Sequence, residues 1–157
     1  MTRISSLFNS YPSVPTAKPG GSRELILIVD DEDSVTLLAE RVLTHEGYRV
    51  ITARNGFQAI DLFKKLHAEL HLVILDFVMP ILSGGEVLIE LLKIDPLVPV
   101  LLTSGFTSNE SLKELLEKQL CGFIPKPLAQ KKLLLNVRST IDAARTAETA
   151  AFLPTAN

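Results

Sequence analysis

The sequence predicts a doubly wound α/β domain built on a five-stranded parallel sheet. Short apolar runs rich in Val, Ile and Leu recur along the chain, and stretches with helical spacing of apolar residues separate them. Runs of the first kind are typical of strands buried on both faces. Strands that alternate with helices are joined by right-handed crossovers, which place helices on both faces of the sheet.

Five segments carry the strand signal. The second is weaker and more polar than the others, which indicates an edge strand. Each of the others is a short apolar run that ends at a polar residue. The predicted strands are Leu25 to Val29, Arg49 to Ala53, Leu72 to Leu75, Val98 to Leu102 and Gly122 to Ile124.

Each strand is followed by a predicted helix. Gly47 closes the first helix, as glycine does at many helix C-termini. Three later helices begin with a side-chain acceptor followed three residues on by Glu or Gln, the pattern of a capping pair. These pairs are Asn55 with Gln58, Ser83 with Glu86 and Thr107 with Glu110. The apolar helix positions include Val35, Leu38, Ala39, Val42 and Leu43 in the first helix, Val87 to Ile94 in the third, Leu112, Leu115 and Leu116 in the fourth, and Leu133, Leu134, Val137 and Ile141 in the last.

At 157 residues the chain has room for one domain with a full core. Residues 1–22 are rich in Ser, Pro and Gly without periodicity, so we expect a flexible N-terminal extension or linker. The folded domain is predicted over residues 23–144. Residues 145–157 turn to Ala, Thr and Glu and are predicted to be a helix extension or a disordered tail.

Composition excludes several kinds of partner and site. The formal charge of -2 gives no attraction to nucleic acid or to an anionic membrane, and no apolar run reaches the roughly 18 residues of a membrane span. The single cysteine, Cys121, rules out an intrachain disulfide and fits a reducing compartment; we expect it to be a buried strand residue. These features predict a cytoplasmic protein. His45, His67 and His71 are expected to be exposed and without a functional role.

Polar residues mark the ends of four predicted strands. Asp30 and Asp31 follow the first strand, Asp76 the third, Thr103 the fourth and Lys126 the fifth. Ligands of open parallel sheets bind outside the carboxyl ends of the strands, so these side chains are expected to meet. Any one of them alone would be better explained by helix starts and turns. Together they predict one acidic pocket.

The three carboxylates favour a bound divalent cation. Like charges about 4 Å apart repel by roughly 4 kcal/mol at an effective dielectric of 20. All the candidate ligands are hard oxygen donors, which favours Mg²⁺, with Mn²⁺ as a substitute. Asp76 is the candidate nucleophile toward phosphorus, because a carboxylate can carry an acyl phosphate. Thr103 and Lys126 could each bind a phosphoryl oxygen.

These residues resemble those of the response-regulator receiver domains of bacterial two-component signalling. The matching motifs lie in the order and spacing of that family and cover the predicted domain. They are Leu27 to Glu32 (LIVDDE), Leu75 to Pro80 (LDFVMP) with Gly84 after it, Leu101 to Gly105 (LLTSG) and Phe123 to Pro127 (FIPKP). The resemblance implies a flavodoxin-like (β/α)5 fold with strand order 2-1-3-4-5.

The resemblance also implies a role for each motif residue. Asp76 would be the phospho-acceptor and Asp31 a direct metal ligand, while Asp30 would act mostly through water and the backbone carbonyl of Val78 would complete the protein's ligands. Thr103 would supply the hydroxyl that moves toward the phosphoryl group in the switch. Lys126 would match the lysine of the family at the end of the fifth strand. Phe123 would be the aromatic switch, and the bond preceding Pro127 would be cis.

The implied function is a phosphorelay module that is not an enzyme on other substrates. It would accept a phosphoryl group from a histidine kinase or a histidine phosphotransfer protein, and signal to an output partner through its fourth helix, fifth strand and fifth helix. In the family, the positions of Val78 and Gly105 flank the attacking water. Neither side chain can orient that water, so slow self-dephosphorylation is expected.

Two alternatives remain at this stage. The first is a Mg²⁺-dependent phosphohydrolase with an aspartyl-phosphate intermediate. Phosphatases of the haloacid dehalogenase type carry a second Asp two residues after the nucleophile, where this chain has Val78. The second is a degenerate receiver that binds partners without phosphorylation, against which the intact set of polar residues argues.

Overall fold

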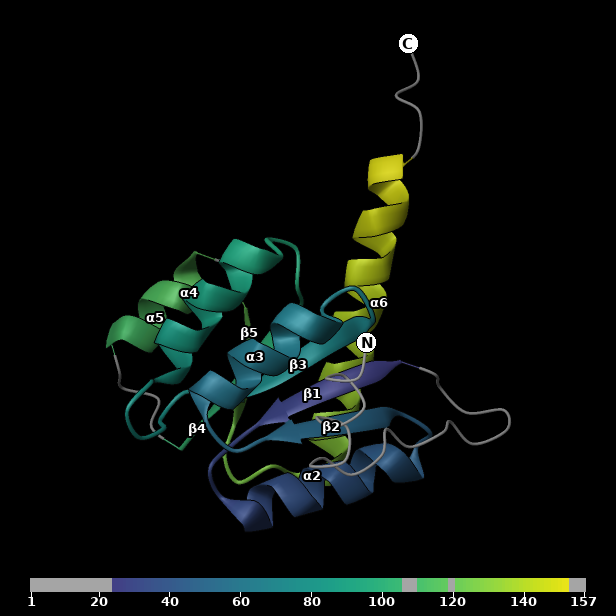
Figure 1. Cartoon of the computed structure of the whole chain (residues 1–157). Coiled ribbons are helices and arrows are strands. Elements are labelled where there is room, and N and C mark those ends of the chain that lie inside the picture. Colours follow the sequence, from purple (N-terminus) through teal and green to yellow (C-terminus); the bar gives the residue numbers. More distant parts are fainter. Residues whose placement is uncertain (1–23, 106–109, 119–120, 153–157) are drawn as a thin grey trace, which may run out of the picture.

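The computed structural model describes residues 24–105, 110–118 and 121–152 of the chain. Within these ranges, five parallel strands form one sheet in the order β2-β1-β3-β4-β5, with helices on both faces (Figure 1). The predicted fold class and strand order are therefore confirmed, including the edge position of β2. The strands are β1 Leu25–Val29, β2 Arg49–Ala53, β3 Leu70–Asp76, β4 Val100–Ser104 and β5 Gly122–Pro125; the helices are α2 Asp33–His45, α3 Gly56–Leu66, α4 Gly84–Ile94, α5 Glu110–Glu117 and α6 Gln130–Phe152.

Strand β1 shows how the sheet is buried on both sides. Leu25, Leu27 and Val29 contribute to a cluster with residues of α3, α4 and α5. Ile26 and Ile28 point the other way and join a second cluster with residues of α2 and α6. All five are almost fully buried, because alternate side chains of a strand project to opposite faces. The continuous apolar run was therefore a reliable sign of a central parallel strand.

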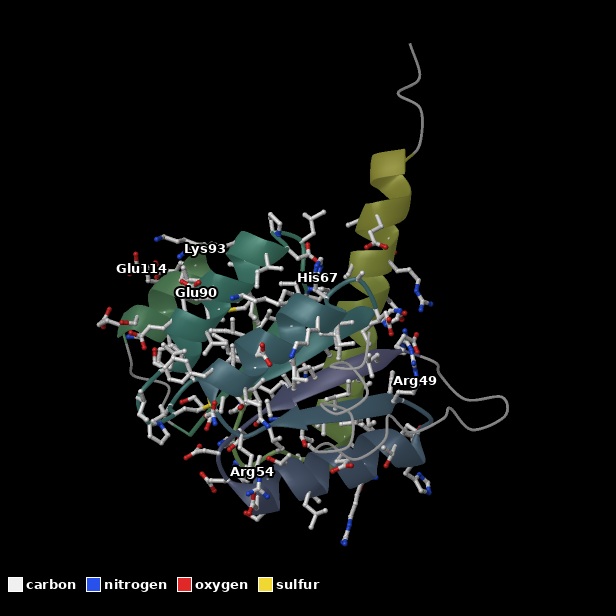
Figure 2. All side chains as sticks on the ribbon, in the orientation of Figure 1. Arg49, Arg54, His67, Glu90, Lys93 and Glu114 are labelled. Atoms are coloured by element: carbon white, nitrogen blue, oxygen red, sulfur yellow. The ribbon has the colours of Figure 1, made fainter. Side chains whose placement is uncertain are left out.

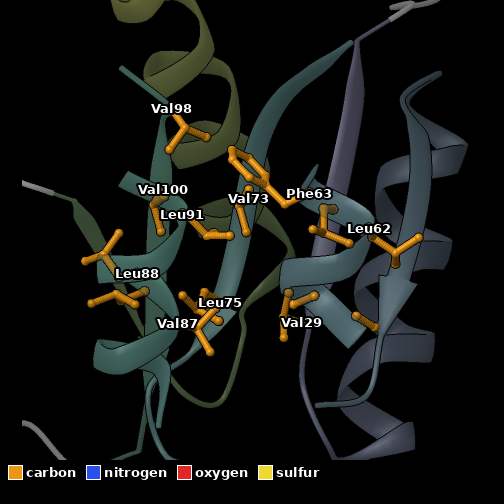
Figure 3. Packing of buried hydrophobic residues seen from close by; sticks show 14 of the residues in the cluster. Val29, Leu62, Phe63, Val73, Leu75, Val87, Leu88, Leu91, Val98 and Val100 are labelled. Carbon is orange, nitrogen blue, oxygen red and sulfur yellow. The ribbon is translucent and has the colours of Figure 1, made fainter. Parts of the chain in front are cut away.

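The first cluster is the larger core of the domain. It includes Phe63 of α3, Leu91 of α4 and Val73 of β3 (Figure 3), and each of these is fully buried. Complete burial of such a side chain contributes about 1.5–3 kcal/mol to the free energy of unfolding. The core thus fixes the strand ends on which the polar residues lie.

The helix boundaries follow the local signals in the sequence. Asn55 accepts a hydrogen bond from the Gln58 backbone N–H, and Ser83 forms a reciprocal capping box with Glu86. After α2, Gly47 adopts a φ of 96°, which glycine tolerates better than other residues. The predicted cap at Thr107 lies outside the described residues.

Three strand ranges and three residue environments differ from the predictions. β3 is Leu70–Asp76 and so starts two residues earlier than expected, β4 is shifted two residues later to Val100–Ser104, and β5 ends one residue later at Pro125.

The three residues are two histidines and the cysteine. His67, which we expected to be exposed, is half-buried, with its ring 5.8 Å from that of Phe63. His71, also expected to be exposed, lies within β3, is half-buried and accepts a hydrogen bond from the Leu25 N–H at 3.1 Å. This contact lies at an irregularity of the β1–β3 register, where Leu25 pairs with Leu70 and Ile26 with Leu72. Cys121 is half-buried and precedes β5, and burial raises the pKa of its thiol to about 11.

Helix α6 is tied to the amino end of the sheet by a buried carboxylate. The Oε1 atom of Glu24 accepts hydrogen bonds from Arg138 at 3.0 Å and from Arg145 at 2.8 Å, two turns apart on α6. Arg138 also donates to Asp142 and to the Tyr48 hydroxyl. The helix continues past residue 144 to Phe152, and it remains anchored to β1 at Arg145. Along the described residues, no helix combines the length and apolarity needed to cross a membrane.

We predict that Glu24→Gln lowers the free energy of unfolding by about 1–3 kcal/mol at pH 7, because two arginines lose their shared anion. Burial would raise the pKa of Glu24, but the hydrogen bond and charge of Arg138, with the charge of Arg145, hold it below its ordinary value. A carboxyl with a lowered pKa stabilises the fold above its unfolded-state pKa, and that contribution is lost as the pH falls through the folded-state pKa.

Urea unfolding should therefore show a difference in the free energy of unfolding between wild type and Glu24→Gln at pH 7. This difference should become smaller below about pH 4.5. The control is Glu90→Gln, which removes an exposed pair with Lys93 and should cost under about 0.5 kcal/mol. Equal stability of wild type and Glu24→Gln at pH 7 would contradict the role assigned to this carboxylate.

Candidate functional site

The polar strand ends meet at the carboxyl edge of the sheet, as predicted. Asp76 of β3 and Thr103 of β4 are direct partners in the parallel register. Backbone hydrogen bonds extend the ladder beyond the strands, from the Asp30 N–H to Ala53 O and from the Lys126 N–H to Ser104 O. The sheet itself therefore holds the positions of these residues.

Three carboxylates form a compact cluster at this edge. Oxygen atoms of Asp30, Asp31 and Asp76 all lie within 4.8 Å of one another. Asp30 and Asp76 are buried, whereas Asp31 is exposed. One cation could thus contact all three groups from the solvent side with little movement of the chain.

Lys126 supplies the positive charge of the cluster. Its Nζ atom lies 2.9 Å from Asp30 Oδ2, 3.3 Å from Asp76 Oδ2 and 3.9 Å from Glu32 Oε1. The Lys126–Pro127 peptide bond is cis. A single ammonium therefore bridges the two buried carboxylates, and only part of their charge is neutralised.

The electrostatics of the cluster follow from this imbalance. Burial, together with the charge of Asp30, raises the pKa of Asp76 to about 6, although Lys126 acts in the opposite direction. Burial alone would lower the pKa of Lys126, but its hydrogen bond to Asp30 and the negative charges of Asp76 and Asp30 raise it above the ordinary value. Lys126 is therefore fully charged at neutral pH, and Asp76 ionises at a free-energy cost.

Backbone donors orient the two buried carboxylates. The Glu32 N–H donates to Asp30 Oδ1 at 2.9 Å, and the Val78 N–H donates to Asp76 Oδ1 at 3.2 Å. Both bonds span two residues, so each aspartate is fixed by the loop that follows it. The Oδ2 atoms of both groups remain directed toward Lys126.

Gly84 permits the close approach of α4 to the acceptor strand. Its N–H donates to Phe77 O at 2.9 Å. A Cβ atom built on Gly84 would lie 2.6 Å from the Cα of Phe77 and would clash with the Asp76 carbonyl. The sequence showed this glycine after the LDFVMP motif, but its role in close packing is visible only in three dimensions.

The two predicted switch residues lie on neighbouring strands, Thr103 on β4 and Phe123 on β5. Thr103 is fully buried beside Asp76, and Phe123 is half-buried next to Leu102 in the register of β4 and β5. Phe123 packs against the larger core. Val78, in contrast, exposes about half of its surface beside the acceptor.

An exposed ion pair links the carboxyl end of β2 to the start of α2. Arg54, at the carboxyl end of β2, pairs with Asp33 in the first turn of α2 at 3.1 Å, whereas Arg49 lies at the opposite end of the strand (Figure 2). Both members of the Arg54–Asp33 pair are largely solvent-exposed. Asp33 is thus an acidic residue in the first turn of a helix, where a negative charge is favourable.

The residues of the cluster fit a hard divalent cation. The fit rests on the donor set, which consists of carboxylate oxygens with solvent access through Asp31. Such oxygens match the preference of Mg²⁺, which keeps several waters and takes few protein ligands. Neither His nor Cys belongs to the group of possible ligands among the described residues, so the arrangement does not resemble a zinc site.

Comparison with known proteins supports the same interpretation. A family model described as "Response regulator receiver domain" matches residues 26–138. The chemotaxis protein CheY of Treponema pallidum (strain Nichols) is 32% identical over 125 residues, which cover 79% of this chain and 87% of that protein. The sensor kinase CckA of Brucella abortus (strain 2308) is 32% identical over 117 residues, which cover 74% of this chain but 12% of the kinase.

A solved structure also matches nearly end to end. The response regulator receiver domain protein from Clostridium thermocellum superposes with a TM-score of 0.73 at 26% identity, covering 79% of this chain and 98% of that one. The similarity therefore extends from the sequence motifs to the fold as a whole.

We predict that Asp76→Asn raises the free energy of unfolding by about 1–3 kcal/mol at pH 7.5 without metal, since a pKa shift of one unit corresponds to about 1.4 kcal/mol. A carboxyl whose folded-state pKa is raised destabilises the fold as the pH rises through that pKa. The difference in the free energy of unfolding between Asp76→Asn and the wild type should be absent below pH 4 and should develop between about pH 4 and pH 6.

Urea unfolding in the presence of a chelator provides the measurement. Asp61→Asn, which removes an exposed pair with Lys65, is the matched control and should change stability by under about 0.5 kcal/mol. A less stable Asp76→Asn variant at pH 7.5 would show that the ionised acceptor is not under strain.

Proposed function

The chain belongs to the response regulator receiver domain family of two-component signalling, and we propose that it accepts a phosphoryl group from a phosphohistidine onto Asp76. The observation that carries this proposal is the setting of the Asp76 carboxylate. It is buried, it lies within 4.8 Å of two further aspartates and 3.3 Å from the Lys126 ammonium. An anionic nucleophile among groups that can bind phosphoryl oxygens suits in-line phosphoryl transfer.

In the proposed reaction a carboxylate oxygen of Asp76 attacks phosphorus. The P–O bond forms as the P–N bond to the donor imidazole breaks, and the imidazole takes up a proton from solvent. Lys126, which now pairs with Asp76, would turn to an oxygen of the transferred group. Thr103, the register partner of Asp76 on β4, would donate its hydroxyl hydrogen to another phosphoryl oxygen.

We further propose that Asp30, Asp31, Asp76 and the backbone carbonyl of Val78 hold Mg²⁺, with Mn²⁺ as a substitute. When bound, Mg²⁺ neutralises charge on the phosphoryl oxygens and on the carboxylates. Asp31, exposed and close to the other two, would be the principal ligand, while Asp30 would act through water because Lys126 already contacts it.

The proposed signal is a shift between two conformations. Thr103 would move toward the phosphoryl group, and Phe123 would follow into the space behind it, so that packing carries the change. Moving the population from 1:99 to 99:1 requires about 5.5 kcal/mol of preference for the active state. The output partner would bind the face formed by α5, β5 and α6.

The proposed donor is a histidine kinase or a histidine phosphotransfer protein. One relative is a sensor kinase, and the similarity covers 12% of its length, so this chain corresponds to a receiver segment there. We propose a cytoplasmic location, which agrees with a single cysteine and no intrachain disulfide. Neither nucleic acid nor a membrane is a proposed partner.

The phosphohydrolase alternative is not favoured. The chain matches the receiver family over residues 26–138, and position 78, where the haloacid dehalogenase pattern requires a second aspartate, is an exposed valine. The degenerate-receiver alternative has no supporting observation, because every polar residue of the acceptor pocket is present.

We predict that acetyl phosphate with Mg²⁺ adds the mass of one phosphoryl group to the wild type and none to Asp76→Asn. Intact-mass spectrometry after incubation provides the measurement, and Asp61→Asn serves as a control that should be labelled like the wild type. Equal labelling of wild type and Asp76→Asn would refute the acceptor assignment. A wild type that takes up no phosphoryl group would instead support the degenerate alternative.

We also predict a long-lived phosphoryl group, with a lifetime of many minutes or more. In the family the positions of Val78 and Gly105 flank the attacking water, and neither residue has a side chain that could orient it. Val78→Asn supplies an amide there and should shorten the lifetime by about tenfold, which is less than the 10²–10⁴-fold effect of a positioned proton-transfer group, because an amide can orient the water but cannot take its proton. A wild-type lifetime of seconds in a phosphoryl-release assay would contradict this expectation.

A further inference from the structure

We propose that Phe57, Val78 and Ile81, here called the rim patch, form an apolar docking surface for the protein that delivers the phosphohistidine. This inference rests on the proposed function and names the contact by which the partner is recognised. Ile81 is its central residue. All three side chains are more than half exposed, and Ile81 is 91% exposed.

The conformation of Ile81 is the first observation. Its φ is 70°, in the left-handed region that is an outlier for a β-branched residue. The Leu82 N–H donates to Pro80 O at 2.8 Å, so Ile81 occupies the centre of a γ-turn with a positive central φ, which is the strained form of this turn. Asn or Gly would occupy this position with less strain.

The solvent exposure of Ile81 means that packing does not account for its presence. Its side chain points away from the core and gives the fold no buried area to offset the backbone strain. Backbone strain that no packing interaction offsets is found mainly at functional sites. We therefore infer that the isoleucine side chain serves an interaction outside the described chain.

The loop geometry places Ile81 beside the acceptor. The loop begins at Asp76 and closes where the Gly84 N–H donates to Phe77 O at 2.9 Å. Val78, within the same loop, donates its N–H to Asp76 Oδ1. Ile81 is thus held at the tip of a short closed loop whose base is the acceptor strand end.

The packing of Leu82 brings Phe57 into the same region. A Cβ atom built on Gly56 would lie 2.7 Å from Leu82 Cδ2, so the start of α3 is in close contact with this loop. Phe57 and Ile81 are the exposed neighbours of these two contacting residues. The rim patch therefore joins two segments that are distant in the sequence.

A phosphohistidine protein is the occupant that this position favours. The Asp76 side chain is only 4% exposed, so a protein donor must bring its histidine into the pocket and cover the surrounding rim. Asp31 and Glu32 lie at the pocket, are exposed and make part of its rim acidic. The complementary surface is an apolar patch beside the histidine, flanked by basic groups. A small phosphodonor needs none of these contacts.

Leu97 offers a matched control for the experiment. It is 81% exposed and lies in the connection between α4 and β4, which enters the sheet at the end opposite Asp76. Ile81→Gly, Ile81→Asn and Leu97→Asn are compared with the wild type. Each is assayed for thermal stability, for labelling by acetyl phosphate, and for phosphotransfer from an autophosphorylated histidine kinase core. A panel of kinases that includes the sensor kinase CckA of Brucella abortus is screened first. The kinase used is one that labels the wild type within minutes.

We expect the Ile81 variants to be at least as stable as the wild type, with Ile81→Gly melting about 2–5 °C higher because strain is relieved. Acetyl phosphate should label every variant at the wild-type rate. The kcat/KM for transfer from the kinase should fall about tenfold in the Ile81 variants, mainly through KM, and stay unchanged in Leu97→Asn, since removal of an interface anchor weakens binding.

Other outcomes would overturn the inference. Unchanged transfer from the kinase to Ile81→Gly would remove the docking role. An equal loss with acetyl phosphate and with the kinase would show that the loop positions Asp76 instead. A concentration-dependent dimer that only the Ile81 variants lose, with normal transfer, would identify a second copy of the chain as the occupant.

The acceptor function of Asp76 and the docking role of the rim patch can be refuted separately. If acetyl phosphate does not label the wild type, the proposed acceptor function itself is wrong. If acetyl phosphate labels the wild type but no kinase of the panel does, the acceptor function stands and the proposed class of partner is overturned.

Discussion

The concentration of negative charge at one edge of the sheet is the constraint on which the rest of this structure depends. Three aspartates share a space of less than 5 Å, and a single lysine bridges the two that are buried. In this state Lys126 neutralises only part of the charge, and the pKa of Asp76 is raised. A bound cation would neutralise the excess negative charge of the aspartates, and a phosphoryl group would take over the contacts of Lys126. The same side chains would therefore govern metal binding, phosphoryl transfer and the stability of the fold.

The fold tolerates this cost because the opposite end of the molecule is firmly held. The two aliphatic clusters bury the faces of the sheet, and Glu24 anchors α6 through two arginines at the amino ends of the strands. The carboxyl edge carries both the ionised acceptor, whose pKa is raised, and the strained backbone of Ile81. Enzymes and switches commonly place strain where it serves function.

The fold class and the meeting of the polar strand ends could be predicted from strand periodicity and strand-end position. The strand order was predicted only through the resemblance to the receiver family. Contacts between distant segments could not be predicted. His71 lies in β3 and accepts a backbone hydrogen bond from Leu25 at an irregularity of the β1–β3 register, a pairing with no local signal. Glu24 precedes a strand like any exposed acid, and only the spacing of Arg138 and Arg145 by two helical turns hinted at a shared partner. The strain at Ile81 is equally invisible in the sequence, since a positive φ is a property of the turn.

The most direct test of this account is the free energy of unfolding measured against Mg²⁺ concentration at pH 7.5. If the acidic cluster is poised for a cation, the stability of the wild type should rise with the logarithm of Mg²⁺ concentration, toward the slope of one bound ion. Asp31→Asn should lack that rise, because Asp31 is the exposed carboxylate of the cluster. No rise in the wild type, or the same rise in Asp31→Asn, would contradict the claim that these three aspartates form one cation site.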